Sequence, residues 1–112
     1  MISIRNLFAA GPPGNSGELV EDLLRTRTFR IERIVSRGHA SPPDFWYDQP
    51  DDEWVLLLSG SAVLRFADGG LITLKPGDHL LIPRRCRHRV DWTDPEQETL
   101  WLTVHFPGDD PA

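Results

Sequence analysis

The residue of this sequence best suited to chemistry is Glu53, a carboxylate at the start of a short apolar run. Residues 54–58 read Trp-Val-Leu-Leu-Leu, and a Ser-Gly pair follows them. A run of this length between turn signals is typical of a buried strand, because a helix would need more residues. Burying a carboxylate is costly unless another group pairs with it. We therefore expect Glu53 to be a catalytic general base or a metal ligand, the alternative being a solvated carboxylate at the mouth of the strand.

Two histidines are candidate partners for this carboxylate. His88 lies on a predicted strand, where a neutral imidazole can face Glu53, although it can also be an exposed histidine within the basic turn at 84–89. His105 shares a strand face with Trp101 and Thr103, and it becomes a ligand if that mixed face lines the interior. The histidines at positions 39 and 79 are assigned to surface or structural roles.

The segment 37–52 is rich in Gly, Pro and Asp, yet it carries three consecutive aromatic residues at 45–47. Idle loops rarely hold so much apolar area, so we expect a structured loop pressed against the body of the protein. Gln49 either lines the site or is simply solvated. Tyr47 and Trp46 are expected to close the mouth of a pocket or form its wall.

Turns divide the rest of the chain into short segments in which apolar residues often alternate with polar ones. Strands are predicted at 28–36, 53–58, 61–66, 71–74, 79–83, 88–92 and 98–106. A hairpin through residues 59 and 60 would place Leu57 opposite Ala62. Residues 1–8 would add an edge strand, and the four-residue spacing of leucines in 18–25 predicts one or two helical turns. This pattern predicts a β-sandwich or a small barrel.

Length and composition indicate one soluble domain, with an N-terminal arm at 1–27, a barrel at 28–106 and a frayed tail at 107–112. The net charge of −5 argues against a nucleic-acid-binding surface. The single cysteine excludes an intrachain disulfide and fits a reducing compartment. No stretch is long and apolar enough to span a membrane or act as a leader, so a cytoplasmic location with no membrane partner is expected.

Two groups of residues resemble the signatures of the cupins. Gly77, Pro83 and His88 have the spacing of the second cupin signature, while Glu53 and Gly60 have that of the end of the first. The resemblance covers about residues 29–106. It implies an all-β, cupin-type jelly-roll β-barrel, here with a short N-terminal helical segment, and exposed barrel edges make a homodimer the expected state.

The first signature departs from the family pattern at its two histidines. Tyr47 and Gln49 stand there, or Trp46 and Asp48 with the longer spacing, and Arg85 stands where the second signature prefers glycine. Cupins of the usual pattern hold iron, manganese, nickel or zinc with three histidines and one glutamate. The resemblance therefore implies one divalent metal ion (Mn, Fe, Zn or Ni) with ligands drawn from five positions: Tyr47, Gln49, Glu53, His88 and His105.

A site of this kind would bind a small molecule inside the barrel. If it is catalytic, the resemblance implies a metal-dependent oxygenase-like or isomerase-like reaction on a small oxygenated substrate. The alternative is a metal-free, non-catalytic cupin that acts as a ligand-binding or regulatory module.

Overall fold

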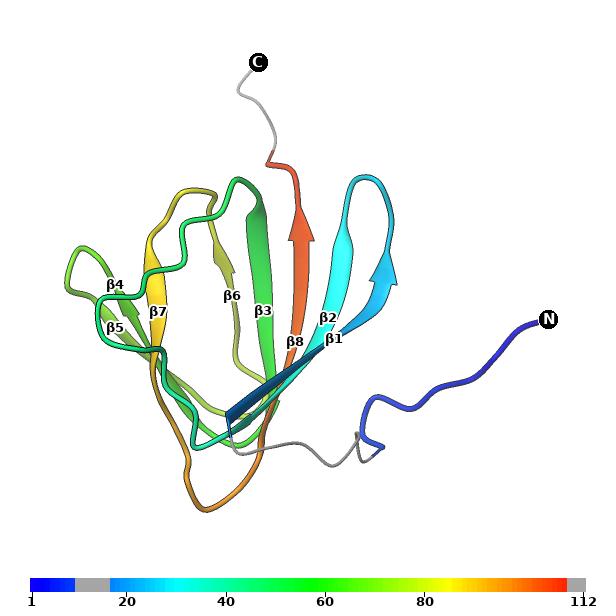
Figure 1. Ribbon diagram of the computed structural model, residues 1–112, viewed down its shortest axis with the longest axis horizontal. Coiled ribbons are helices and arrows are strands. Elements are labelled where there is room, and N and C mark those ends of the chain that lie inside the picture. Colours follow the sequence, from blue (N-terminus) through cyan, green and yellow to red (C-terminus); the bar gives the residue numbers. More distant parts are fainter. Residues whose placement is uncertain (10–16, 109–112) are drawn as a thin grey trace.

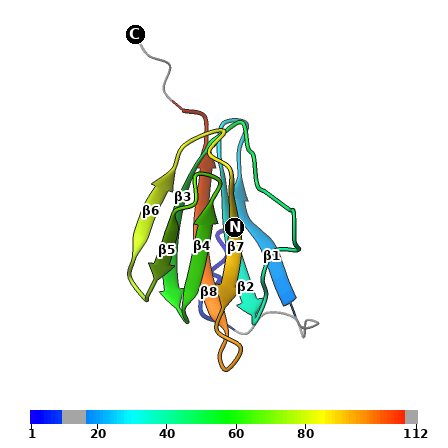
Figure 2. The same cartoon turned by 90° about the vertical axis from the view of Figure 1, so that its left-hand side faces the viewer.

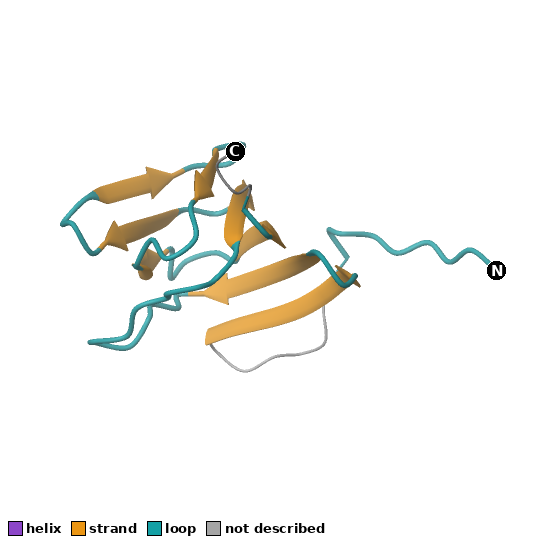
Figure 3. Ribbon diagram, turned by 90° about the horizontal axis from the view of Figure 1, so that it is seen from above, coloured by secondary structure: helices purple, strands orange, loops and turns teal. Residues whose placement is uncertain are grey.

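The structure is a computed structural model that describes residues 1–9 and 17–108. Within these ranges there are eight strands and no helix (Figure 3), so no helix of the described residues could cross a membrane. Two antiparallel sheets face each other (Figures 1 and 2), which confirms the predicted all-β jelly roll. The strands are β1 (Gly17–Arg25), β2 (Arg30–Arg37), β3 (Asp52–Ser59), β4 (Ala62–Phe66), β5 (Leu71–Leu74), β6 (His79–Ile82), β7 (His88–Thr93) and β8 (Thr99–Phe106).

The larger sheet has the strand order β1-β2-β8-β3-β6, and the smaller has the order β5-β4-β7. Strands β3 and β4 are consecutive but lie in different sheets, so the predicted hairpin is wrong: Leu57 pairs with Trp101, and Ala62 pairs in the other sheet. The chain turns a corner at Gly60, where φ is +87° and a Cβ would lie 2.3 Å from Thr99 Oγ1. Only glycine combines this backbone conformation with so close an approach.

The helical segment predicted at 18–25 is wrong, because these residues belong to strand β1. They pair with β2 along their whole length, with a bulge between Asp22 and Leu24. A helix this short is unstable without strong packing, whereas the edge of β2 offers a backbone partner to nearly every residue of β1. The edge strand predicted at 1–8 is also wrong, since residues 1–9 contain no strand.

The hydrophobic core fills one end of the space between the two sheets. Val55 and Leu57 of β3 meet Ala62 and Leu64 of β4 there, and Trp101 of β8 joins them. These apolar residues occupy alternate positions along their strands, as a sheet with one inward face requires. The same inward alternation places Glu53 and the histidines of β7 and β8 toward the other end of the interior.

The N-terminal segment is held on the outer face of the larger sheet by Arg33 of β2. The guanidinium donates hydrogen bonds to the carbonyls of Leu7 (2.8 Å) and Ala9 (2.9 Å), and it pairs with Glu21 of β1. Arg33 is thereby buried although it points away from the core. The frayed tail predicted at 107–112 lies largely outside the described residues, which end at 108.

Candidate functional site

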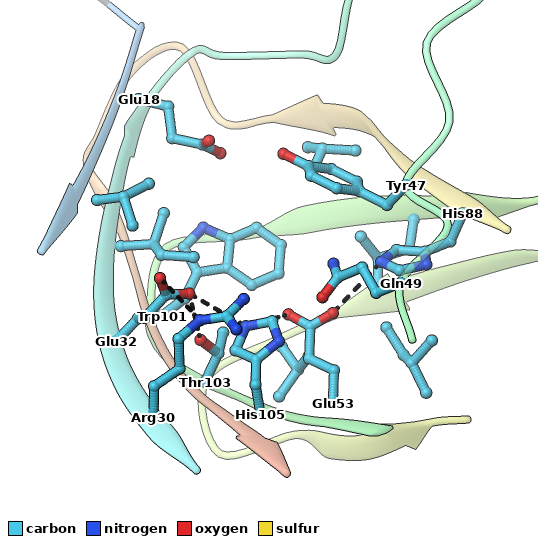
Figure 4. Close-up of a pocket in the computed structure, with 16 residues that line it drawn as sticks. Glu18, Arg30, Glu32, Tyr47, Gln49, Glu53, His88, Trp101, Thr103 and His105 are labelled. Atoms are coloured by element: carbon cyan, nitrogen blue, oxygen red, sulfur yellow. Dashed lines mark hydrogen bonds and ion pairs between the residues drawn. The ribbon is translucent and has the colours of Figure 1, made fainter. Parts of the chain in front are cut away.

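A cavity of about 240 Å³ opens between the sheets beyond the apolar core (Figure 4). Its walls combine apolar side chains of the core with polar and charged ones, and Trp101 lies between the two kinds (Figure 4). The fold thus brings every predicted site residue to one cavity. These residues are Tyr47, Gln49, Glu53, His88 and His105.

Glu53 of β3 and His88 of β7, which the sequence predicted to face each other, are in contact. Both side chains are buried, and His88 Nε2 lies 3.4 Å from Glu53 Oε1. His88 Nδ1 lies 2.9 Å from the carbonyl oxygen of Cys86, which can only accept, so Nδ1 carries a hydrogen. In the neutral imidazole Nε2 would then present a lone pair to a carboxylate oxygen. Such an arrangement of two acceptors requires a proton or another positive group between them.

The pKa of His88 is consistent with a proton at this position. Burial lowers this pKa, but the interaction with the Glu53 carboxylate and the hydrogen bond to the Cys86 carbonyl together raise it above the ordinary value. The positive form of His88, with Nε2–H directed at Glu53, is therefore kept to a higher pH than in an ordinary histidine.

His105 of β8 lies on the opposite side of the Glu53 carboxylate. Its Nε2 is 3.5 Å from Glu53 Oε2 and 3.1 Å from Glu32 Oε1, and Glu32 in turn pairs with Arg30 at 3.4 Å. The charged groups therefore form a row across the floor of the cavity, from Arg30 to His88 (Figure 4). Among the described residues, two buried atoms in this row, Glu53 Oε1 and His105 Nδ1, have no hydrogen-bond partner.

The loop before β3 closes one side of the cavity through Tyr47 and Gln49. The backbone of Tyr47 exchanges hydrogen bonds of 2.7 and 3.1 Å with that of His88, and the two rings stack with centroids 5.3 Å apart. Burial and the nearby carboxylates raise the pKa of Tyr47 to about 12, so its phenol is neutral and a poor metal ligand. The backbone carbonyl of Gln49 accepts a hydrogen bond from the backbone amide of Arg85 at 2.8 Å, while the Gln49 side chain points into the cavity (Figure 4).

Arg85 explains one departure from the cupin signature. Its φ is +62°, in the left-handed region where glycine is favoured, and its guanidinium pairs with Asp48 in solvent at 3.4 Å. The backbone therefore keeps the conformation that the family pattern indicates, although the side chain differs.

Three charged residues of the cavity were missed in the sequence: Glu18, Arg30 and Glu32. Glu18 was hidden by the wrong helix prediction; as part of β1 it lies near Tyr47 at the upper side of the cavity (Figure 4). Burial raises the pKa of Glu18, and His39, 3.7 Å away, partly counters that effect. Arg30 and Glu32 alternate with Ile31 in β2, so the sequence placed both on one face of the strand, but the more apolar opposite face gave no signal that they face inward.

The donor atoms fit a resident metal centre only in part. Glu53 and His88 converge on one point, but His105 Nε2 is turned to Glu32. Among residues 1–9 and 17–108, no three His, Cys, Asp or Glu side chains are placed to hold a metal ion. The arrangement therefore does not match the centre of three histidines and one glutamate that cupins of the usual pattern have.

Comparison with known proteins agrees with the fold. The family model described as cupin domain matches residues 33–105. The crystal structure of a "putative mannose-6-phosphate isomerase" from Ralstonia eutropha JMP134 is 48% identical, covers 95% of this chain and 99% of its own, and superimposes with a TM-score of 0.87.

More distant structures share the fold alone. A conserved protein with a double-stranded β-helix domain from Klebsiella pneumoniae is 18% identical, with coverage of 95% and 90% and a TM-score of 0.76. A cupin superfamily protein from Desulfitobacterium hafniense DCB-2 is 20% identical, with coverage of 87% and 84% and a TM-score of 0.71. No curated protein matches the chain.

Proposed function

Because this chain belongs to the cupin domain family, we propose that its cavity binds one small polar molecule, with Glu53 and His88 as the anchoring pair. The cavity volume of about 240 Å³ is below the range of about 300–1,000 Å³ that is usual for pockets holding drug-sized ligands. The ligand is therefore a small metabolite. Core side chains would contact its apolar part, and the charged floor would contact its polar part.

The observation that carries this proposal is the incomplete hydrogen bonding of Glu53 Oε1. This buried atom lies 3.4 Å from His88 Nε2, but among the described residues no donor makes a hydrogen bond of good geometry to it. Leaving a buried acceptor unsatisfied costs about 1–3 kcal/mol, and more when the group is charged. A ligand that donates a hydrogen bond to Oε1 would recover that cost, which makes this atom the natural anchor.

The same pair supports proton transfer within a small oxygenated substrate. Glu53 would remove a proton as general base, and His88, protonated on Nε2, would supply one as general acid. An aldose–ketose isomerisation moves a proton between neighbouring carbons and needs both roles. The Ralstonia protein, 48% identical to this chain, bears the name of a putative isomerase, which supports this reaction class.

A second candidate function is binding of a divalent metal ion between Glu53 and His88. It is favoured by the 3.4 Å separation of Glu53 Oε1 and His88 Nε2, which lets both atoms bind one ion. The side-chain oxygen of Gln49 would be a third ligand, while His105 would have to leave Glu32 to take part. With so few nitrogen donors, this site would bind Zn, Ni, Fe or Mn more weakly than a three-histidine centre.

One set of variants separates the two candidates. In ligand-observed NMR, the wild-type protein should bind small polyols; Glu53→Gln should abolish this binding, and Glu96→Gln, an exposed loop variant, should retain it. Elemental analysis after incubation with Mn, Fe, Zn or Ni should show less than stoichiometric metal. A stoichiometric metal that is lost in both Glu53→Gln and His88→Asn would establish the second candidate instead. Ligand binding unchanged by Glu53→Gln would overturn the first.

The proposal includes a homodimer as the working state. Strand β1 is an edge of the larger sheet, and an unpaired edge is a ready site for association with another chain. Apolar side chains are exposed beside it, namely Ile2, Ile4, Phe8, Val20 and Leu24. Light scattering coupled to size-exclusion chromatography tests this state, and a monomer at micromolar concentration would contradict it.

A further inference from the structure

The charges around the cavity bear on the ligand it selects. Among the described residues, three carboxylates line it, those of Glu18, Glu32 and Glu53, against one guanidinium, that of Arg30. With all three carboxylates ionised, the lining carries two net negative charges when both imidazoles are neutral and one when His88 is protonated. Protonation of His88 and His105 would neutralise the lining without making it positive. An anionic ligand would meet no excess of positive charge here.

Each positive group of the cavity is also already paired within the protein. Arg30 contacts Glu32, His105 lies between Glu32 and Glu53, and His88 lies between Glu53 and a backbone carbonyl. To bind a phosphate, either histidine would have to leave a buried carboxylate, and that carboxylate would then be unpaired. Breaking a buried pair in this way is strongly unfavourable. Arg30 could donate to a phosphate through its other N–H groups, but only with the Glu32 carboxylate beside the anion. By contrast, Glu53 Oε1 can accept a further hydrogen bond, because its contact with His88 Nε2 at 3.4 Å is not a hydrogen bond of good geometry.

Two aromatic walls favour positive charge as well. The indole N–H of Trp101 is satisfied by Ser36 Oγ at 3.0 Å, outside the cavity lining, while the ring itself lies in the cavity wall (Figure 4). Tyr47 stands across from it, near Glu18 (Figure 4). A cation attracted by an aromatic face within about 6 Å gains about 0.5–2 kcal/mol. Burial is the main cause of the raised pKa of Tyr47, and the three carboxylates add to it.

We propose that this cavity selects a small amine-bearing ligand over an anionic one, with the ammonium group on Glu53 Oε1 and the carboxylate of Glu18 as a second acceptor at the upper side. This inference rests on the proposed function, whose ligand class it narrows. It also separates this chain from the activity named for its Ralstonia relative, because a sugar phosphate would bring a dianion into an acidic cavity.

The experiment compares ligands that share a skeleton and differ in charge. Isothermal titration calorimetry would measure D-mannosamine, D-mannose and D-mannose 6-phosphate, together with the corresponding glucose series, at low and moderate salt. We expect the amine to bind about tenfold more tightly than the neutral sugar, equivalent to about 1.4 kcal/mol. The phosphate should bind more weakly than either. Added salt should reduce the advantage of the amine.

Variants assign the selectivity to the carboxylates. Glu18→Gln, on the edge strand, should lower affinity for the amine severalfold more than affinity for the neutral sugar, since it removes a charge and keeps the shape. Glu96→Gln, exposed and remote, should change neither value. The inference would be overturned if a sugar phosphate bound more tightly than the amino sugar of the same skeleton, or if neither amino sugar bound. If the inference fails but neutral sugars bind to the wild-type protein and not to Glu53→Gln, the proposed function is still supported. If no ligand binds, both the inference and the proposed function are overturned.

Discussion

The raised pKa of His88 makes a specific prediction about stability and pH. Burial would lower this pKa, but contact with Glu53 and the hydrogen bond to Cys86 raise it above the ordinary value of 6.5. The folded protein therefore keeps this proton to a higher pH than the unfolded chain does. The resulting stabilisation is fully present below the unfolded pKa, and it is lost as the pH rises through the folded pKa.

The geometry sets the scale of this effect. At 3.4 Å, the attraction between the imidazolium and the carboxylate is about 5 kcal/mol at an effective dielectric constant of about 20. The side chains are only 7% and 11% exposed, so the cost of desolvation cancels much of that attraction. One retained proton also limits the slope. The free energy of unfolding can fall by at most about 1.4 kcal/mol per pH unit through this residue.

Glu53→Gln tests the prediction because it removes the charge and keeps the shape. Urea unfolding followed by tryptophan fluorescence should show the wild-type protein losing stability above pH 6.5, and the variant should lose less. NMR titration should show a lower His88 pKa in the variant, with the resonance assigned by its absence in His88→Asn. Glu96→Gln should keep the wild-type slope. A Glu53→Gln protein with an unchanged slope and an unchanged His88 pKa would refute the ion-pair argument.

Two further predictions concern backbone positions with positive φ. Gly60→Ala should lower the free energy of unfolding by about 3 kcal/mol, because its new Cβ would meet Thr99 at 2.3 Å; Gly69→Ala, at φ +97° with open space, should lose only about 1 kcal/mol. Equal losses in thermal unfolding would contradict the corner described at Gly60. Arg85→Gly should raise stability by about 0.5–1 kcal/mol, since it relieves left-handed backbone at φ +62° at the cost of one exposed ion pair. Arg87→Gly, where φ is not positive, should lower stability instead, and the same chemical-denaturation assay distinguishes the two signs.

The strands were predictable where a local pattern decides them. Alternation and turn residues predicted β2 to β8 within a few positions, because each strand has one inward and one outward face. The sequence near Gly60 predicted only that the chain changes direction. Whether β4 folds back on β3 or crosses to the other sheet depends on Thr99, which lies 38 residues from its hydrogen-bond partner Ser61. No local pattern contains that contact.

The helix prediction failed for a related reason. Leucines four residues apart in 18–25 suit a helix, yet the unpaired edge of β2 provides backbone partners that make a strand more stable. That error concealed Glu18. The inward position of His105 depended on which face of β8 looks into the interior, and its contact with Glu32 joins residues from distant parts of the chain. Spacing could therefore suggest which side chains share the cavity, but it could not predict their pairing.

The alternation of β2 has a practical consequence for handling the protein. Glu32 faces the cavity and its neighbour Arg33 holds the N-terminal segment on the outer face. A single peptide bond thus separates the ligand site from the anchor of the first nine residues. Displacing that segment would take both carbonyl partners from the Arg33 guanidinium and leave it paired with Glu21 alone. Ligand affinities should therefore be compared on protein that keeps the first nine residues in place.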